Sequence, residues 1–132
     1  MSISGTYVLT SNENYSEWLT GLGVPADTVA KMVAAQPRME VKEEEGTEAL
    51  HIKTIVGEKE FENTLHMGSD SKATLPGGIE FTLNLTLSGS TIKGTWALGS
   101  KSGQASVVMT ASGATQTMTL GDVTAKRHYT RQ

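Results

Sequence analysis

A chain of 132 residues with a formal net charge of −3 at pH 7 is long enough to bury a core, and we expect one domain over residues 1–132. The acidic balance argues against nucleic acid as a partner and against strong binding to anionic membranes. The absence of cysteine excludes a disulfide framework, a thiol nucleophile and a cysteine-based metal site. Residues 1–5 carry neither the basic nor the apolar segment of a signal peptide, so a cytoplasmic location is expected.

The N-terminal part of the chain begins as a strand and then takes a helical period. Alternation over residues 5–10 predicts the strand. Apolar side chains spaced as on one helical face then predict a helix at about residues 14–22. Asn14 and Glu17 fit a capping box at its start, and Gly23 fits a C-terminal cap. The apolar face consists of Tyr15, Trp18, Leu19 and Leu22.

A second short helix is predicted at about residues 25–35. Pro25 suits its first turn and Pro37 ends it. Its apolar face consists of Val29, Met32 and Val33. The two helices therefore lie back to back in the sequence, joined by a tight turn.

The rest of the chain reads as short alternating strands separated by turns. These strands fall at residues 39–42, 50–56, 61–67, 72–75, 79–87, 92–98, 105–109, 116–120 and 122–130. With the first strand they make about ten in hairpin succession, which predicts a mainly β protein whose antiparallel meander closes on itself. A barrel of this size can enclose a ligand.

The expected inward faces contain too few large residues to fill such a barrel. Several inward positions are small or polar, namely Thr54, Asn63, Gly94, Ala105, Gln116 and Ala125. A lumen lined in this way should be partly empty and wet, which favours a binding cavity over a packed interior.

The last strand carries the clearest candidate for a functional site. Its inward face should hold two small apolar residues followed by Arg127 and Tyr129. A guanidinium inside a protein needs a partner, which either the protein or a ligand supplies, unless its tip reaches water at the strand end. Gln116 and Thr54 are the polar neighbours that we expect for it, with ordered water completing its hydrogen bonds.

Other chemistry is not indicated by the sequence. None of the histidines, His51, His66 and His128, pairs with a carboxylate at the spacing of a metal site, and we expect all three on the surface. No nucleophile-elbow motif is present. Arg127 and Tyr129 are poor bases at neutral pH, so we expect neither an enzyme nor a cofactor.

The order of these segments resembles the intracellular lipid-binding proteins of the calycin superfamily, which include the fatty-acid-binding and cellular retinoid-binding proteins. Residues 5–9 (Gly-Thr-Tyr-Val-Leu) resemble the family's opening G-T-W-K-L, and residues 13–24 resemble its first helix. Residues 37–39 match its P-x-M at the start of the next strand. Residues 126–131 (Lys-Arg-His-Tyr-Thr-Arg) resemble its terminal T-R-V-Y-x-R.

The resemblance implies a ten-stranded up-and-down barrel with a helix-turn-helix lid between its first two strands. It also implies a monomeric, non-enzymatic carrier of a fatty acid, a retinoid or a similar apolar acid. Many members hold the ligand carboxylate with two arginines and a tyrosine. Arg127 and Tyr129 match the second arginine and the tyrosine, whereas Val107 stands in place of the first arginine.

The residues that we expect to contact the ligand are Arg127, Tyr129, Trp96, Val107, Tyr15, Leu19, Met32, Thr54, Gln116 and Met118. By the same resemblance, the ligand should enter between the second helix and the turns near Gly57 and residues 76–78. Two alternatives stay open within related folds. One is a carrier of a tetrapyrrole such as bilirubin, since residues 24–25 and 120–123 are similar to a fluorescent family member. The other is a secreted lipocalin-like carrier.

Overall fold

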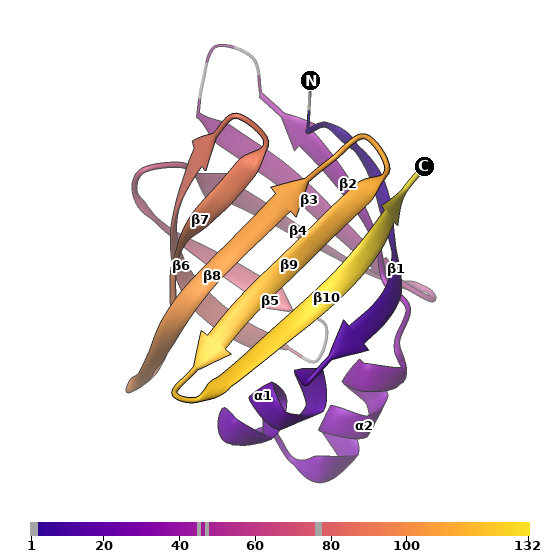
Figure 1. Cartoon of the computed structure of the whole chain (residues 1–132), viewed down its shortest axis with the longest axis vertical. Coiled ribbons are helices and arrows are strands. Elements are labelled where there is room, and N and C mark those ends of the chain that lie inside the picture. Colours follow the sequence, from indigo (N-terminus) through magenta and orange to yellow (C-terminus); the bar gives the residue numbers. More distant parts are fainter. Residues whose placement is uncertain (1–2, 45, 47, 76–77) are drawn as a thin grey trace.

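The computed structural model describes residues 3–44, 46, 48–75 and 78–132. Ten antiparallel strands follow one another along the chain, and two helices lie between the first and the second strand (Figure 1). The helices are α1 (Tyr15–Gly21) and α2 (Ala26–Ala34). The strands are β1 (Gly5–Glu13), β2 (Arg38–Glu43), β3 (Ala49–Val56), β4 (Lys59–His66), β5 (Asp70–Leu75), β6 (Ile79–Ser88), β7 (Thr91–Leu98), β8 (Lys101–Met109), β9 (Gly113–Leu120) and β10 (Val123–Arg131).

The strands form one sheet in the order β4-β3-β2-β1-β10-β9-β8-β7-β6-β5. Because β1 pairs with both β2 and β10, the first and last strands of the chain join, and the sheet curls into a nearly closed barrel. The two helices lie across one end of this barrel (Figure 1). The predicted fold class is confirmed.

The barrel is joined by side chains where its two edge strands, β4 and β5, meet. Asn63 on β4 uses its amide as a strand would use its backbone: Nδ2 donates to the Thr74 carbonyl at 3.0 Å, and Oδ1 accepts from the Thr74 N–H at 2.9 Å. Near the other end of the seam, the His66 N–H donates to Ser71 Oγ at 2.8 Å. These bonds satisfy edge groups that no ladder pairs.

The start of α1 differs from the sequence prediction. Asn14 has a left-handed backbone (φ 55°) and makes no capping hydrogen bond, so the expected capping box with Glu17 is wrong. Its side-chain Nδ2 instead donates to the Thr124 carbonyl on β10 at 3.1 Å. The C-terminal cap is confirmed: Gly23 has a φ of 92°, and the Val24 N–H donates to the Leu19 carbonyl.

An aromatic cluster attaches α1 to the barrel. The Trp18 ring lies 5.4 Å from that of Trp96 and 5.8 Å from that of Phe81. Trp96 Nε1 donates to the Thr119 carbonyl at 2.9 Å, and Trp18 Nε1 reaches the same oxygen at 3.4 Å. A Cβ at Gly103 would lie 2.7 Å from Trp96 Nε1, so only glycine leaves room for this indole.

Two buried apolar clusters occupy the two ends of the barrel. The cluster at the helix end consists of Tyr15, Trp18, Leu19, Leu22, Val29, Met32, Phe81, Trp96, Met118 and Ala125. The other, which includes Tyr7 and Leu50, lies away from the helices. Between them, inward-facing residues such as Ile52, Phe61 and Val107 are only half-buried. Side chains therefore do not fill the whole interior.

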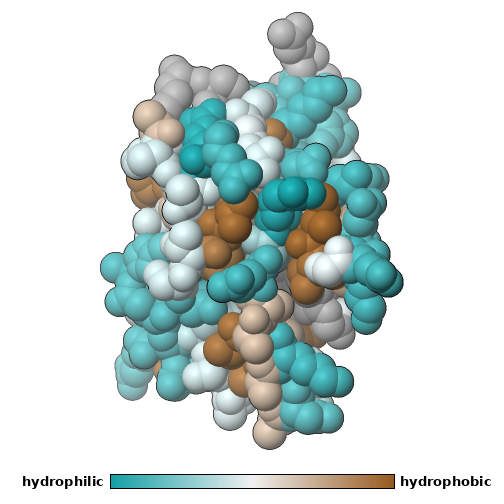
Figure 2. Space-filling model, turned by 90° about the vertical axis from the view of Figure 1, so that its right-hand side faces the viewer, coloured by the Kyte–Doolittle hydropathy of each residue, from teal (hydrophilic) through white to brown (hydrophobic). Residues whose placement is uncertain are grey.

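The face of the molecule on the side of β1 is mostly hydrophilic (Figure 2). Seen from the side of β1, apolar residues form small separate patches, one of them over the helices at the lower end (Figure 2). Within the described ranges, no helix is long and apolar enough to cross a membrane.

Asn63→Leu should lower the free energy of unfolding by about 1–3 kcal/mol, because it leaves both backbone groups of Thr74 without their partner. Urea unfolding of the variant and the wild type measures this. Gln104→Leu is a matched control, because the exposed side chain of Gln104 on β8 makes no hydrogen bond within the described residues, and it should change stability by less than about 0.5 kcal/mol. Equal effects of the two substitutions would show that the seam needs no side-chain bridge.

Candidate ligand-binding site

The candidate site is a row of inward-facing residues across four neighbouring strands. Arg127 on β10 pairs with Gln116 on β9 and with Asn12 on β1. Gln116 in turn pairs with Val107 on β8. Because cross-strand partners point to the same face of a sheet, one wall of the barrel presents an amide, a guanidinium, a second amide and an isopropyl group side by side.

A β-bulge in β1 brings Asn12 into this row. The pairing register with β10 shifts between Leu9 and Ser11, which leaves Thr10 as the extra residue. Simple alternation from the buried Leu9 would turn Ser11 and Glu13 inward. After the bulge, Asn12 faces the interior and Glu13 is exposed on the outside. Residues 10–13 are all polar, so the phase shift at the bulge leaves no mark on the hydrophobic pattern, and the sequence did not indicate Asn12.

Arg127 is 7% exposed and is held by an amide and two aromatic rings. Its Nε donates to Asn12 Oδ1 at 2.9 Å, and its Nη1 lies 3.4 Å from the Tyr15 hydroxyl. Its Cζ lies 4.1 Å from the centre of the Tyr15 ring and 5.9 Å from that of Tyr129. Both distances are in the range of cation–π contact.

These contacts correct the environment predicted for Arg127. Its protein hydrogen bonds go to Asn12 and Tyr15, not to Gln116 or Thr54. Gln116 Oε1 instead accepts a hydrogen bond from the hydroxyl of Tyr129. Gln116 is nonetheless the cross-strand neighbour of Arg127, as predicted, whereas Thr54 lies in another cross-strand row.

Tyr129 completes the polar group. Its hydroxyl donates to Gln116 Oε1 at 3.4 Å, the long limit of a hydrogen bond. Burial raises the pKa of both Tyr129 and Tyr15, and the positive charge of Arg127 opposes this rise only in part. Both phenols are therefore neutral donors at physiological pH, and the weakly held hydroxyl of Tyr129 can change its partner.

The other predicted contact residues lie in two places. Four of them are buried in the cluster at the helix end, namely Leu19, Met32, Trp96 and Met118. Thr54 is half-buried on β3, paired with Met39 and Phe61. Tyr15 belongs to both groups, because it packs in the helix-end cluster and contacts Arg127.

The expected entrance is described in part. On α2, Val29 and Met32 are buried and Val33 is half-buried, so the apolar face of this helix is largely covered. Gly57 has a φ of 60° in the turn between β3 and β4. Residues 76 and 77 lie outside the described residues, and entry by this route stays a prediction.

All three tyrosines, Tyr7, Tyr15 and Tyr129, have a pKa raised by burial above the ordinary value of 10.0. A raised folded-state pKa stabilises the fold below pH 10.0 and loses that contribution as the pH rises through the shifted values. We expect less tyrosinate absorbance in the folded protein at pH 10.0 than in the urea-unfolded chain, which is half ionised there. A phenol that titrates at or below pH 10.0 in the folded protein would contradict the burial of the site.

A nearly closed ten-stranded barrel, lidded by a helix pair and lined by an inward Arg–Tyr pair, is the architecture of a calycin lipid-binding protein. The sequence model described as the Lipocalin / cytosolic fatty-acid binding protein family matches residues 1–131, and the chain belongs to this family. Family and fold together support a carrier of hydrophobic ligands.

Solved structures of fatty-acid-binding proteins have the same fold. Protein 1 of Echinococcus granulosus superposes with a TM-score of 0.87 at 19% identity, covering 98% of this chain and 96% of that one. The Schistosoma mansoni protein, in complex with arachidonic acid, gives 0.87 at 20% identity, covering 98% and 95%. The brain protein of Drosophila melanogaster gives 0.84 at 24% identity, covering 98% and 99%. Among curated protein sequences, none matches this chain.

Proposed function

We propose that this protein is a cytosolic, non-enzymatic carrier that binds an apolar acid, such as a fatty acid or a retinoid-like acid, inside its barrel. The observation that carries the proposal is the state of Arg127. Its side chain is buried, faces the interior and forms no ion pair with any carboxylate of the described residues.

A buried charge without a counter-charge is costly unless something compensates it. Asn12 and the two tyrosine rings reduce this cost, but none of them carries a negative charge. The Nη2 nitrogen of Arg127 has no hydrogen-bond partner within the described part of the chain. A ligand carboxylate would supply both the counter-charge and the missing acceptor, and the low dielectric of the interior would strengthen its bonds.

Tyr129 adds a second donor to this anchor. Its hydroxyl lies on the same inward face as Arg127, two residues further along β10. Because its bond to Gln116 is long, the hydroxyl can turn to an anion at little cost. An acid held by one guanidinium and one phenol carries a single negative charge, since Val107 offers no second cation.

The rest of the ligand would lie along the unfilled part of the barrel. The inward-facing side chains there are apolar for the most part and half-buried, namely Met39, Ile52, Phe61, Leu83, Ala105 and Val107. Covering them with an alkyl or polyene chain would remove apolar surface from water, which contributes roughly 25 cal/mol for each Å². The ligand class that fits is therefore an acid head with a long apolar body.

Arg127→Gln should weaken the binding of an acid by about 2–5 kcal/mol, the range for removing one partner of a buried charge pair. The loss should lie at the low end of that range, because Val107 leaves a single arginine and a water molecule can replace its partner. Matched titrations of oleic acid and oleyl alcohol, or of retinoic acid and retinol, measure the effect. The neutral alcohols should lose much less.

Arg38→Gln is the matched control, since Arg38 is exposed on β2 and should leave both affinities unchanged. Equal losses of acid and alcohol in Arg127→Gln, or no loss of either, would show that Arg127 is structural. The polar end of the ligand would then lie elsewhere in the barrel.

A further inference from the structure

We infer that Asn12 determines the charge of the ligand, by acting as a neutral positioning partner for Arg127. This inference rests on the proposed function. Asn12 and Glu13 are neighbours on β1, and one is neutral while the other is acidic. The bulge at Thr10 decides which of the two side chains faces the guanidinium of Arg127.

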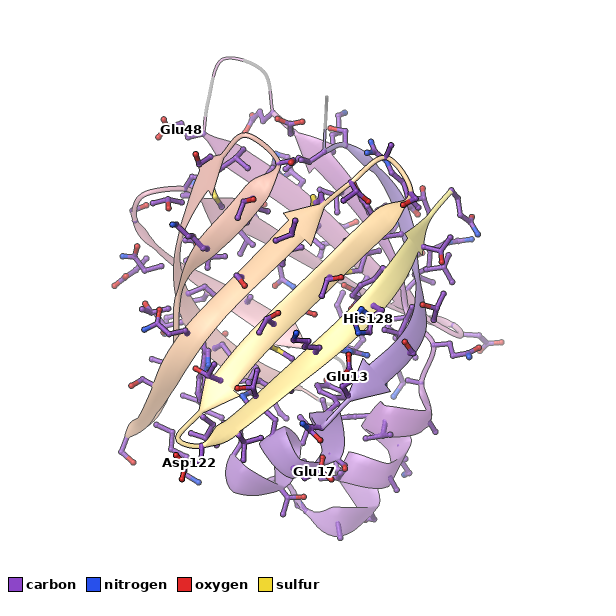
Figure 3. The ribbon with its side chains drawn as sticks, in the orientation of Figure 1. Glu13, Glu17, Glu48, Asp122 and His128 are labelled. Carbon is purple, nitrogen blue, oxygen red and sulfur yellow. The ribbon has the colours of Figure 1, made fainter. Side chains whose placement is uncertain are left out.

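The outward side chain is the acidic one. Glu13 points away from the lumen and bonds through Oε2 to His128 Nε2 on the neighbouring strand (Figure 3). Lys126, the cross-strand partner of Glu13, adds a positive charge on this face. His128 also contacts Thr115 Oγ1 on β9 through Nδ1, at 3.3 Å. The Glu13 carboxylate thus has its partner, His128, on the outer face of the wall.

The inward side chain is the neutral one. Asn12 Oδ1 accepts from Arg127 Nε at 2.9 Å, the bond that a carboxylate oxygen would make at the same place, but without a negative charge. A carboxylate there would neutralise Arg127 from within the protein and would occupy the role that we assign to the ligand. The amide orients the guanidinium and leaves its positive charge for an anion from outside.

The position of this bond also decides which edge of the guanidinium a ligand can use. With Nε bonded to Asn12, the edge that remains is the end-on pair Nη1 and Nη2. Nη1 lies beside the Tyr15 hydroxyl at a distance of 3.4 Å, and Nη2 has no partner in the described part of the chain. A planar or tetrahedral anion approaching along the lumen would therefore meet two N–H donors in a fixed direction.

The test compares two fluorescent probes with the same aromatic rings. 1-Anilinonaphthalene-8-sulfonate is an anion at all relevant pH values, and N-phenyl-1-naphthylamine is its neutral counterpart. Asn12→Asp keeps the size of the side chain and adds one negative charge next to Arg127. The affinity for the sulfonate should fall by about tenfold or more, and the affinity for the neutral probe should stay within about threefold.

Two further variants separate charge from contact. Asn12→Ala removes the bond but adds no charge, so it should cost the sulfonate probe less than Asn12→Asp does. Gln104→Glu makes the same amide-to-carboxylate change at an exposed position of β8 and should leave both probes unchanged. Equal losses of the two probes in Asn12→Asp, or unchanged sulfonate binding, would overturn the inference.

Arg127→Gln, measured with the same probes, tests the role of Arg127 separately from that of Asn12. If it removes the preference for the sulfonate while Asn12→Asp does not, the proposed function stands and the role of Asn12 falls. If Arg127→Gln leaves the preference intact, Arg127 is not the anchor, and both proposals fall together.

Discussion

The structure depends on one electrostatic constraint, a buried guanidinium without a carboxylate partner among the described residues. Arg127 cannot be left bare in an interior of low dielectric, and the surrounding residues answer this need with neutral groups only. Asn12 supplies an amide oxygen, and Tyr15 and Tyr129 supply the faces of their rings. The arrangement tolerates the charge without cancelling it, which is the property that a carrier of anions needs.

Arg127 also connects helix α1 to the barrel wall, through its contact with Tyr15. Tyr15 is the first residue of α1, and one turn later Trp18 packs against Trp96 and Phe81 on the barrel wall. The helix therefore contacts the guanidinium through one aromatic ring and the aromatic cluster through another. Placement of the lid and orientation of the arginine are parts of one network, in which the Thr119 carbonyl holds both indoles.

Features that follow from periodicity could be predicted, and features that follow from local irregularity could not. Strict alternation placed Arg127 and Tyr129 on one inward face, and the single change of period located the helix pair. The bulge at Thr10 changes no hydrophobic pattern, so Asn12 was missed as the partner of Arg127. The hydrogen bonds of Asn63 between β4 and β5 depend on which two strands lie at the seam. The sequence of a single strand does not show which strand is its neighbour.

The most direct measurement is the carboxyl pKa of bound [1-13C]oleic acid, followed by 13C NMR. Burial alone raises a carboxyl pKa above its ordinary value in water, whereas an adjacent arginine lowers it. We expect the bound carboxyl to keep its ionised chemical shift as the pH falls from neutral to that value, and we expect Arg127→Gln to raise the carboxyl pKa. A carboxyl that titrates well above its ordinary value in the wild-type protein would show that Arg127 does not hold the acid.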